Sequence, residues 1–352
     1  MKYAFNGFLF SQRPTGVMRY AREILQEMDK FCNNLDWVLV VPEYAENVPN
    51  LTNIKTIRFG NIKGNLWEQI EFSKFIKKNS YESVNFNNTM PLQKSGIIVI
   101  HDIAYKLHPE FSNSVHGKLS NIYHRIIFKR AAKGEKPIIT VTHFSKIQLV
   151  EYYNIEPDRI HVIGNAWQHM EKIGVDKGIL NKYSLKKNSF YFSLGSLSKM
   201  KNTKWVYKVA KENPDKLFVL AGARPKSYAE ELTQPQNVIL VGFVTDEEVK
   251  TLINNCKAFI YPSIYDGFGI PPLEALSQGA KVICSNAACL PEVYRNSVYY
   301  IDPYETNVDL DSLLNEKIDE AKSVLIRYSW EESAKRFFEL LIEYAKTEDI
   351  NN

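Results

Sequence analysis

Short apolar runs rich in valine and isoleucine recur along the whole 352-residue chain, and amphipathic segments separate them. A strand that is buried on both faces of a parallel sheet is such a continuous apolar run, and a helix usually connects it to the next parallel strand. The alternation therefore predicts a doubly wound α/β structure. The runs lie at residues 2–8, 37–41, 54–59, 83–86, 97–102, 137–142 and 159–164, and again at 190–196, 216–222, 237–243, 258–263, 281–285 and 298–302.

The chain is long for one hydrophobic core, which favours two domains of roughly 150–180 residues each. Residues 168–189 are polar and lack a strand pattern, so we expect the boundary there. This gives a Rossmann-like N-terminal domain over residues 1–168 and a second one over residues 169–329. The last segment, residues 330–352, begins with an apolar face at helical spacing and predicts an amphipathic helix.

Composition narrows the classes of partner. The net charge of +4 is mild and indicates no nucleic-acid partner. The N-terminus lacks the apolar core of a signal peptide, and no run of about 18 apolar residues occurs, so we expect a cytoplasmic protein. Residues 116–136 place basic residues among apolar ones, which allows peripheral contact with an anionic inner-membrane surface. The alternative is a solvated helix that packs on a sheet.

The stretch YDGFGIPPLEALSQGAKV, residues 265–282, carries the strongest local signal for a site. Gly267 and Gly269 free the backbone, and the two prolines that follow predict the first turn of a helix. The unpaired N–H groups of a helix start suit an anion such as phosphate. Asp266 and Glu274 flank that start, so the ligand must also offer hydrogen-bond donors.

Extended to YPSIYDGFGIPPLEALSQGAKVICSNAACLPEV, this stretch resembles the signature of the retaining family 4 glycosyltransferases of the GT-B fold. Other segments resemble the same family in the same order, so that the resemblance covers almost the whole chain: TGVMRYAREI, IHDIAYKLHPE, VTHFSKIQLVEYYNIEPDRIHVIGNAW and SLGSLSKMKN. It implies two Rossmann-like domains with a cleft between them and a C-terminal helix that crosses back to the first. The first domain would bind the acceptor and the second a nucleotide sugar.

The resemblance also implies roles for single residues. The backbone N–H groups of Gly269 and Ile270 would bind the diphosphate, and Lys201 would neutralise the leaving group, so that neither a metal nor another cofactor is needed. Glu274 would accept hydrogen bonds from the ribose hydroxyls. Asp266, where the family usually has glutamate, would accept them from the donor sugar.

His101 and Asp102 end a predicted strand, and in the family the histidine lies close to the donor sugar. A lone histidine can equally be a hydrogen-bonded core residue. We expect His101, Lys201 and Asp266 to be catalytic. The other residues expected to contact substrate are Gly16, Asp102, Lys199, Arg224, Gly242, Phe243, Val244, Gly267, Phe268, Gly269, Ile270 and Glu274.

The expected activity is the retaining transfer of a hexose, with GDP-mannose as the first choice of donor, to a glycan or a lipid-linked acceptor. The product would be a bacterial surface polysaccharide such as O-antigen or capsule. UDP-sugars, dTDP-rhamnose and GDP-fucose remain open as donors. Two other functions also remain open: a nucleotide-sugar epimerase of the same architecture, and a catalytically weak partner subunit that binds nucleotide.

Overall fold

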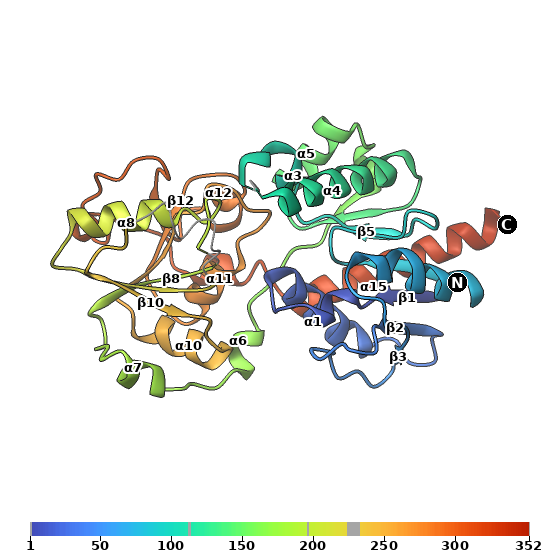
Figure 1. The fold of residues 1–352 in the computed structure, drawn as a ribbon, viewed down its shortest axis with the longest axis horizontal. Coiled ribbons are helices and arrows are strands. Elements are labelled where there is room, and N and C mark those ends of the chain that lie inside the picture. Colours follow the sequence, from blue (N-terminus) through green and yellow to red (C-terminus); the bar gives the residue numbers. More distant parts are fainter. Residues whose placement is uncertain (1, 112–113, 196, 224–232, 352) are drawn as a thin grey trace. The chain divides into compact units, whose positions relative to one another are not determined.

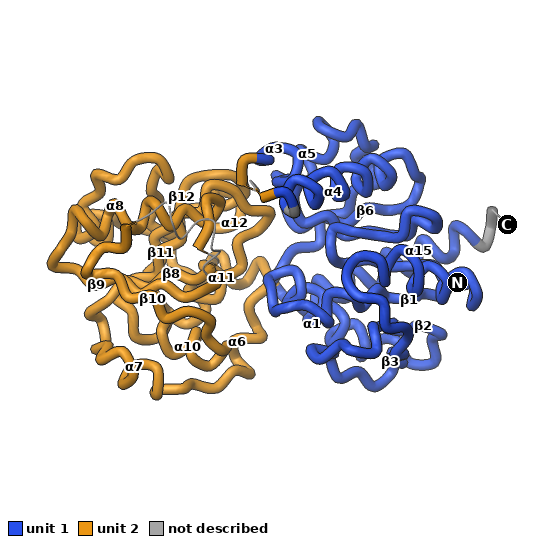
Figure 2. The backbone as a smooth tube through the Cα atoms, viewed as in Figure 1, with its two compact units in different colours: residues 1–109, 115–165, 329–352 blue, residues 110–114, 166–328 orange. Residues whose placement is uncertain are grey.

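The computed structural model describes residues 2–111, 114–195, 197–223 and 233–351, and it divides into two compact units (Figures 1 and 2). Unit 1 comprises residues 1–109, 115–165 and 329–352, and unit 2 comprises residues 110–114 and 166–328. The main division therefore follows Asn165, whereas the sequence placed the boundary after Gln168. The chain returns to unit 1 at Ser329, so the C-terminal segment belongs to the first unit.

Unit 1 is built on a seven-stranded sheet with the order β3-β2-β1-β4-β5-β6-β7, and every neighbouring pair is parallel. Each predicted apolar run of the first half forms one of these strands, as the α/β pattern required. Their bounds are β1 Tyr3–Asn6, β2 Trp37–Val41, β3 Lys55–Arg58, β4 Glu82–Asn85, β5 Ile97–Val99, β6 Ile138–Thr140 and β7 Ile160–Val162.

Unit 2 is built on a six-stranded parallel sheet with the order β10-β9-β8-β11-β12-β13. In both sheets the strand order reverses beside the first strand of the unit, and ligands of open α/β sheets bind at the carboxyl ends near such a point. The strands coincide with the predicted runs of the second half: β8 Phe190–Leu194, β9 Leu217–Ala221, β10 Val238–Gly242, β11 Ala258–Tyr261, β12 Val282–Ser285 and β13 Tyr299–Ile301.

The helices of unit 1 include the first and the last long helices of the chain (Figure 1). The Thr15 hydroxyl accepts a hydrogen bond from Met18 N at 3.2 Å and so starts the first of them, α1. The last, α15, contacts α1 through the rings of Tyr20 and Trp330, whose centroids lie 6.1 Å apart. The bounds are α1 Gly16–Asp29, α2 Ser73–Lys78, α3 Ala104–Leu107, α4 Val115–Lys133, α5 His143–Tyr153 and α15 Trp330–Asn351, with a π-helix at Trp67–Phe72.

The core of unit 2 forms where α8 packs on the sheet, with Trp205 and Val206 of that helix in one buried cluster with Phe218, Ile260 and Ile283 of the strands. The helices described in this unit are α6 His169–Lys172, α7 Gly178–Lys182, α8 Thr203–Glu212, α10 Asp246–Asn255, α11 Ile270–Ser277, α12 Leu290–Tyr294, α13 Leu310–Leu313 and α14 Lys322–Leu325.

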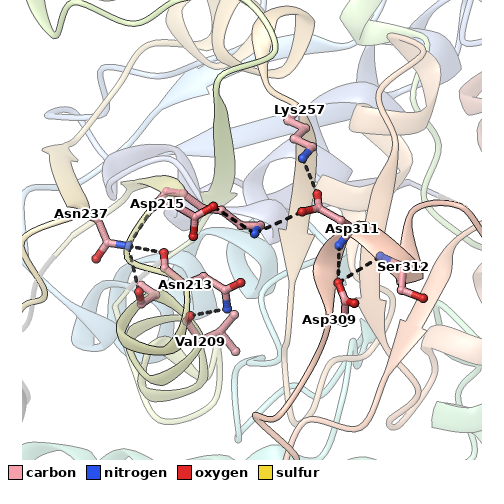
Figure 3. Close-up of polar contacts among 10 residues, drawn as sticks. Val209, Asn213, Asp215, Asn237, Lys257, Asp309, Asp311 and Ser312 are labelled. Atoms are coloured by element: carbon pink, nitrogen blue, oxygen red, sulfur yellow. Dashed lines mark hydrogen bonds and ion pairs between the residues drawn. The ribbon is translucent and has the colours of Figure 1, made fainter.

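Polar side chains tie the amino ends of the unit 2 strands to the surrounding helices (Figure 3). Asp311 of α13 accepts a hydrogen bond at 2.5 Å from Lys257, which directly precedes β11. Asn237, directly before β10, donates from Nδ2 to the carbonyl oxygens of Ala210 at 2.8 Å and Asn213 at 2.9 Å, at the end of α8. A ligand site is expected at the carboxyl ends of the parallel strands. These contacts lie at the opposite, amino ends.

Candidate functional site

The glycine-rich loop between β11 and α11 has a shape that only glycine permits at its last position. Gly269 caps α11 with a φ of 79°, and a Cβ atom there would lie 2.7 Å from Leu290 Cδ2. The Tyr294 hydroxyl donates a hydrogen bond to the Gly269 carbonyl oxygen and so fixes the end of the loop. The helix begins at Ile270 and continues into two prolines, which lack N–H groups. The N–H groups nearest the helix start are therefore those of Gly269 and Ile270, as predicted.

Lys201 and Asp266 form an ion pair beside this loop. The Lys201 ammonium group also donates to the Tyr261 hydroxyl at 2.6 Å, and Tyr261 is the last residue of β11. Burial is the main cause that raises the pKa of the Tyr261 hydroxyl far above its ordinary value, so this group stays neutral. The charge of the site thus resides in the ammonium group and the carboxylate.

The second oxygen of Asp266, Oδ2, is one of five buried side-chain atoms of the described residues that have no hydrogen-bond partner. A small pocket beside the pair is lined by Ser193, Gly195, Lys201 and Thr203 at the carboxyl end of β8. A carboxylate with an unmatched oxygen, next to an ammonium group with three donors, is an arrangement that a polar ligand can complete.

Glu274 lies in the second turn of α11 and has a partner that sequence reasoning missed. His169, in the short helix α6, places Nε2 2.8 Å from Glu274 Oε1. Both side chains are largely buried, with 3% of the histidine and 12% of the glutamate exposed. No spacing rule links residues 105 positions apart, and the histidine stands in the polar stretch that the sequence indicated only as a boundary.

Three predicted residues belong to unit 1. Gly16 is the first residue of α1 and is exposed. Asp102 lies after β5 and accepts a hydrogen bond at 2.9 Å from the backbone N–H of Ala104, the first residue of α3. His101 is buried, and its ring meets the Tyr20 ring edge to face with the centroids 5.1 Å apart.

The hydrogen bonds of His101 determine its protonation state. Its Nε2 lies 2.9 Å from the carbonyl oxygen of Phe86, which can only accept, so Nε2 carries the proton and Nδ1 is an acceptor. Burial lowers the pKa of this imidazole to about 4, and the hydrogen bond to Phe86 opposes the shift in part. The ring is therefore neutral near pH 7.

The remaining predicted residues of unit 2 that the structure describes lie at or after the carboxyl ends of β8, β10 and β11. Gly267 and Phe268 are buried in the loop before α11. Gly242 ends β10 with a φ of 75° and is followed by Phe243, which is 71% exposed, and by half-buried Val244. Half-buried Lys199 stands in the loop after β8, and Arg224 lies outside the described residues.

Comparison with known families identifies the part of the chain that holds this loop. Residues 178–334 match the family profile described as "Glycosyl transferases group 1". The match includes Lys201, Asp266 and Glu274 but not His169, which lies before its first residue.

Two relatives carry related names. The O-antigen chain mannosyltransferase RfbU of Salmonella typhimurium is 27% identical over 224 residues, which are 62% of this chain and 59% of that protein. The O-antigen chain mannosyltransferase B of Escherichia coli is 25% identical over 268 residues, which are 72% of this chain and 68% of that protein. The first alignment thus leaves about two fifths of the Salmonella protein unmatched.

The fold is also that of solved structures. The structure of HepE from Anabaena in complex with UDP and glucose superimposes with a TM-score of 0.66 over 99% of both chains, at 17% sequence identity. This likeness concerns the fold alone, and it covers both units. The resemblance expected from the sequence is thereby confirmed: residues 178–334 carry a domain of the group 1 glycosyltransferases, within a chain that has the two parallel-sheet units of the GT-B fold.

Proposed function

We propose that this protein is a retaining hexosyltransferase that uses a nucleotide diphosphate sugar, with GDP-mannose as the first choice. Its acceptor would be a glycan or a lipid-linked glycan of a bacterial surface polysaccharide. The observation that carries the proposal is the Lys201–Asp266 ion pair beside the start of α11. A cation, a carboxylate and backbone N–H donors thereby lie together at the carboxyl ends of the strands. The mannosyltransferase names of two relatives support the choice of sugar.

The chemistry of the transfer needs these groups. The bond between the anomeric carbon and the diphosphate oxygen breaks, and the acceptor oxygen attacks the same face of that carbon. The departing phosphate oxygen takes the proton of the acceptor hydroxyl. Lys201 and the N–H groups of Gly269 and Ile270 would stabilise the charge that builds on the diphosphate.

The two acids would hold the uncharged parts of the donor. Glu274, fixed by His169, is suited to accept hydrogen bonds from the ribose hydroxyls. Asp266 would accept one from the donor sugar through Oδ2 once the loop adjusts around the ligand. His101, which burial keeps neutral, would accept a hydrogen bond from a sugar hydroxyl at Nδ1, because its Nε2–H is bonded to the Phe86 carbonyl oxygen.

A panel of nucleotide sugars tests the donor. We expect GDP-mannose to raise the melting temperature, since a ligand at about 100 times its Kd adds about 2.7 kcal/mol, and to transfer mannose to a lipid-linked glycan acceptor. Lys201→Met should abolish transfer, whereas Lys204→Met, which changes an exposed lysine of α8, should not. If only UDP-sugars raise the melting temperature, the assignment of GDP-mannose as donor is wrong. If the protein converts a UDP-sugar in the absence of an acceptor, it is an epimerase.

We also propose that transfer needs no divalent metal, because Lys201 and the helix start supply the positive charge. Transfer should persist in EDTA. Loss of activity in EDTA that Mn²⁺ or Mg²⁺ restores would contradict this part of the proposal and leave the donor assignment intact.

A further inference from the structure

Glu68 is a carboxylate buried inside unit 1, and the transfer described above gives it no role. Only 1% of the residue is exposed, and it lies in the π-helix Trp67–Phe72. Such π-helical turns are rare and often mark functional segments. Burial raises the pKa of the Glu68 carboxyl, and its hydrogen bonds oppose the shift. An apolar side chain of similar size would avoid the cost of burying a charge, so packing alone does not account for this carboxylate.

Both oxygens of Glu68 accept hydrogen bonds from other parts of unit 1. Oε2 accepts at 2.7 Å from Asn6 Nδ2, at the end of β1, and at 2.7 Å from the Thr89 hydroxyl, in the loop after β4. Oε1 accepts at 3.0 Å from Gln69 Nε2 and at 3.1 Å from the Tyr123 hydroxyl of α4. The strand order of the sheet reverses between β1 and β4, so the carboxylate lies where a ligand site is expected.

Two of these donors determine which side chain the position accepts. Asn6 and Gln69 donate through amide N–H groups, one to each Glu68 oxygen. The amide oxygen of Asn6 accepts from Phe8 N at 3.2 Å, and that of Gln69 accepts from Leu92 N at 2.9 Å. Neither amide can therefore turn round without losing a hydrogen bond. An NH2 group in place of either Glu68 oxygen would meet an N–H donor, so glutamine has the shape of Glu68 but does not fit its hydrogen bonds.

The loop between β4 and β5 connects Glu68 to His101. Thr89 of this loop donates to Glu68, and the neighbouring Asn88 accepts a hydrogen bond through Oδ1 from His101 N at 2.7 Å. The Phe86 carbonyl oxygen of the same loop lies 2.9 Å from His101 Nε2. Asn88 has a φ of 56°, so the loop makes a left-handed turn between these contacts. The loop is thus held by Glu68 on one side and holds His101 on the other.

We propose that Glu68 is a positioning residue, which fixes the His101 ring through the loop after β4 so that Nδ1 can accept a hydrogen bond from the donor sugar. This inference deepens the proposed transfer and rests on it for the role of His101. A shift of the loop would move the Phe86 carbonyl oxygen, turn the ring and displace Nδ1. A misplacement of about 1 Å in an active site can lower a rate about a hundredfold.

Steady-state kinetics of the full chain test the role in transfer. Glu68→Gln should lower kcat about tenfold with little change in KM for the donor, because the nucleotide is proposed to bind in unit 2. His101→Gln removes the ring on which Glu68 acts, so Glu68→Gln/His101→Gln should be no slower than His101→Gln alone. Glu82→Gln is the matched control. It changes another largely buried carboxylate, which pairs with Lys136 at the amino end of β4, and should retain the wild-type kcat.

An NMR measurement tests the positioning without turnover. The long-range proton–nitrogen spectrum of the imidazoles reports the tautomer and the surroundings of His101, whose signals are those missing in His101→Gln. We expect Glu68→Gln to shift these signals and Glu82→Gln to leave them in place. Thr89→Val removes the hydroxyl that binds the loop to Glu68 and should shift them too, whereas Thr89→Ser should restore them. The Thr89 variants decide the question if Glu68→Gln does not fold.

Either of two results would overturn the inference. The first is a double variant whose loss in kcat is the product of the two single losses, since Glu68 would then act independently of His101. The second is an unchanged His101 spectrum in both Glu68→Gln and Thr89→Val. If the wild type transfers sugar from no donor, the proposed function fails, whereas a shift of the His101 signals still supports the positioning of the ring by Glu68.

Discussion

Lys201 and Asp266 lie 65 positions apart in the sequence, yet the fold joins them in one ion pair. The sequence assigned them separate ligands, the diphosphate and the donor sugar. The pair couples these roles, because any change at Asp266 also alters the charge that surrounds the ammonium group. Mutations at the two acids of the loop therefore have to be interpreted with Lys201 in view.

We predict that Asp266→Ala keeps or tightens the binding of the bare nucleoside diphosphate and lowers transfer. The ammonium group would lose its internal carboxylate and face the phosphates with its full charge, while the donor sugar would lose an acceptor. Glu274→Ala should weaken the same nucleotide by about 1.5–3 kcal/mol, as expected for hydrogen bonds to a charged group. Titration calorimetry with the nucleotide measures both. Equal losses of nucleotide affinity in the two variants would show that Asp266 and Glu274 do not bind separate parts of the donor.

If Glu274 binds the ribose as proposed, His169 is a positioning residue that acts through the carboxylate, and this role has a distinct kinetic signature. His169→Ala should leave the buried carboxylate without its 2.8 Å partner and raise KM for the donor about tenfold with little change in kcat. His169→Gln retains a donor and should recover most of the affinity. If glutamine and alanine impair the enzyme equally and both lower its melting temperature, the histidine serves only packing.

The buried imidazole of His101 predicts a pH dependence of stability. Its pKa of about 4 in the fold lies below the value of about 6.5 expected in the unfolded chain, so only the unfolded chain takes up a proton between these two pH values. The stabilisation is present above pH 6.5 and is lost as the pH falls toward 4, by about 3 kcal/mol. Urea unfolding at pH 7.0 and 4.5 should show a smaller difference for His101→Gln than for wild type. An identical difference would assign the acid sensitivity to other groups.

At the scale of elements, the loop and helix α11 place the site, and their shape depends on one glycine. Gly269 and Gly279 flank the helix with φ values of 79° and 76°, so an alanine is strained at either position. The two positions differ in the room for a side chain. A Cβ at Gly269 would lie 2.7 Å from Leu290, and a Cβ at Gly279 would have no neighbour within 4 Å.

This pair of glycines gives an internal comparison. We predict that Gly269→Ala costs about 1–3 kcal/mol more than Gly279→Ala, the usual range for an overpacked site, and that only Gly269→Ala impairs nucleotide binding. Urea unfolding and calorimetry measure the two effects. A similar cost at both positions would mean that Leu290 moves away without penalty.

At the scale of the whole molecule, the last helix completes the first unit. Helix α15 buries Trp330, Phe337 and Leu341 in unit 1, and the Tyr3 hydroxyl of β1 donates to the Leu341 carbonyl oxygen at 2.8 Å. Three large side chains removed from water contribute on the order of 5–9 kcal/mol, comparable with the total stability of a domain.

Truncation before Trp330 should therefore unfold unit 1 or lower its melting temperature strongly. Phe337→Ala is the milder version, with an expected loss of about 3–5 kcal/mol, and Lys335→Ala on the exposed side of the same helix should cost less than about 0.5 kcal/mol. Circular dichroism during thermal unfolding measures all three. A truncated chain that melts like the wild type would show that unit 1 does not need α15.

Much of the architecture follows from local patterns. All thirteen predicted apolar runs are strands of the two sheets, because a strand buried on both faces must be apolar along its length. The start of α11 was predictable for a similar reason, since Gly269 and the prolines after Ile270 constrain the backbone whatever surrounds them. The family signature rests on the same contiguous residues.

Only the tertiary structure decided which distant residues meet. The order of strands in a sheet depends on crossovers, so the chain alone does not reveal that Lys201 reaches Asp266 or that His169 reaches Glu274. Burial is likewise a property of the assembled unit, and it makes His101 neutral and leaves an Asp266 oxygen unmatched. Sequence patterns specify what each segment can form, whereas long-range packing determines which side chains share a site, because it brings together residues that no local spacing connects.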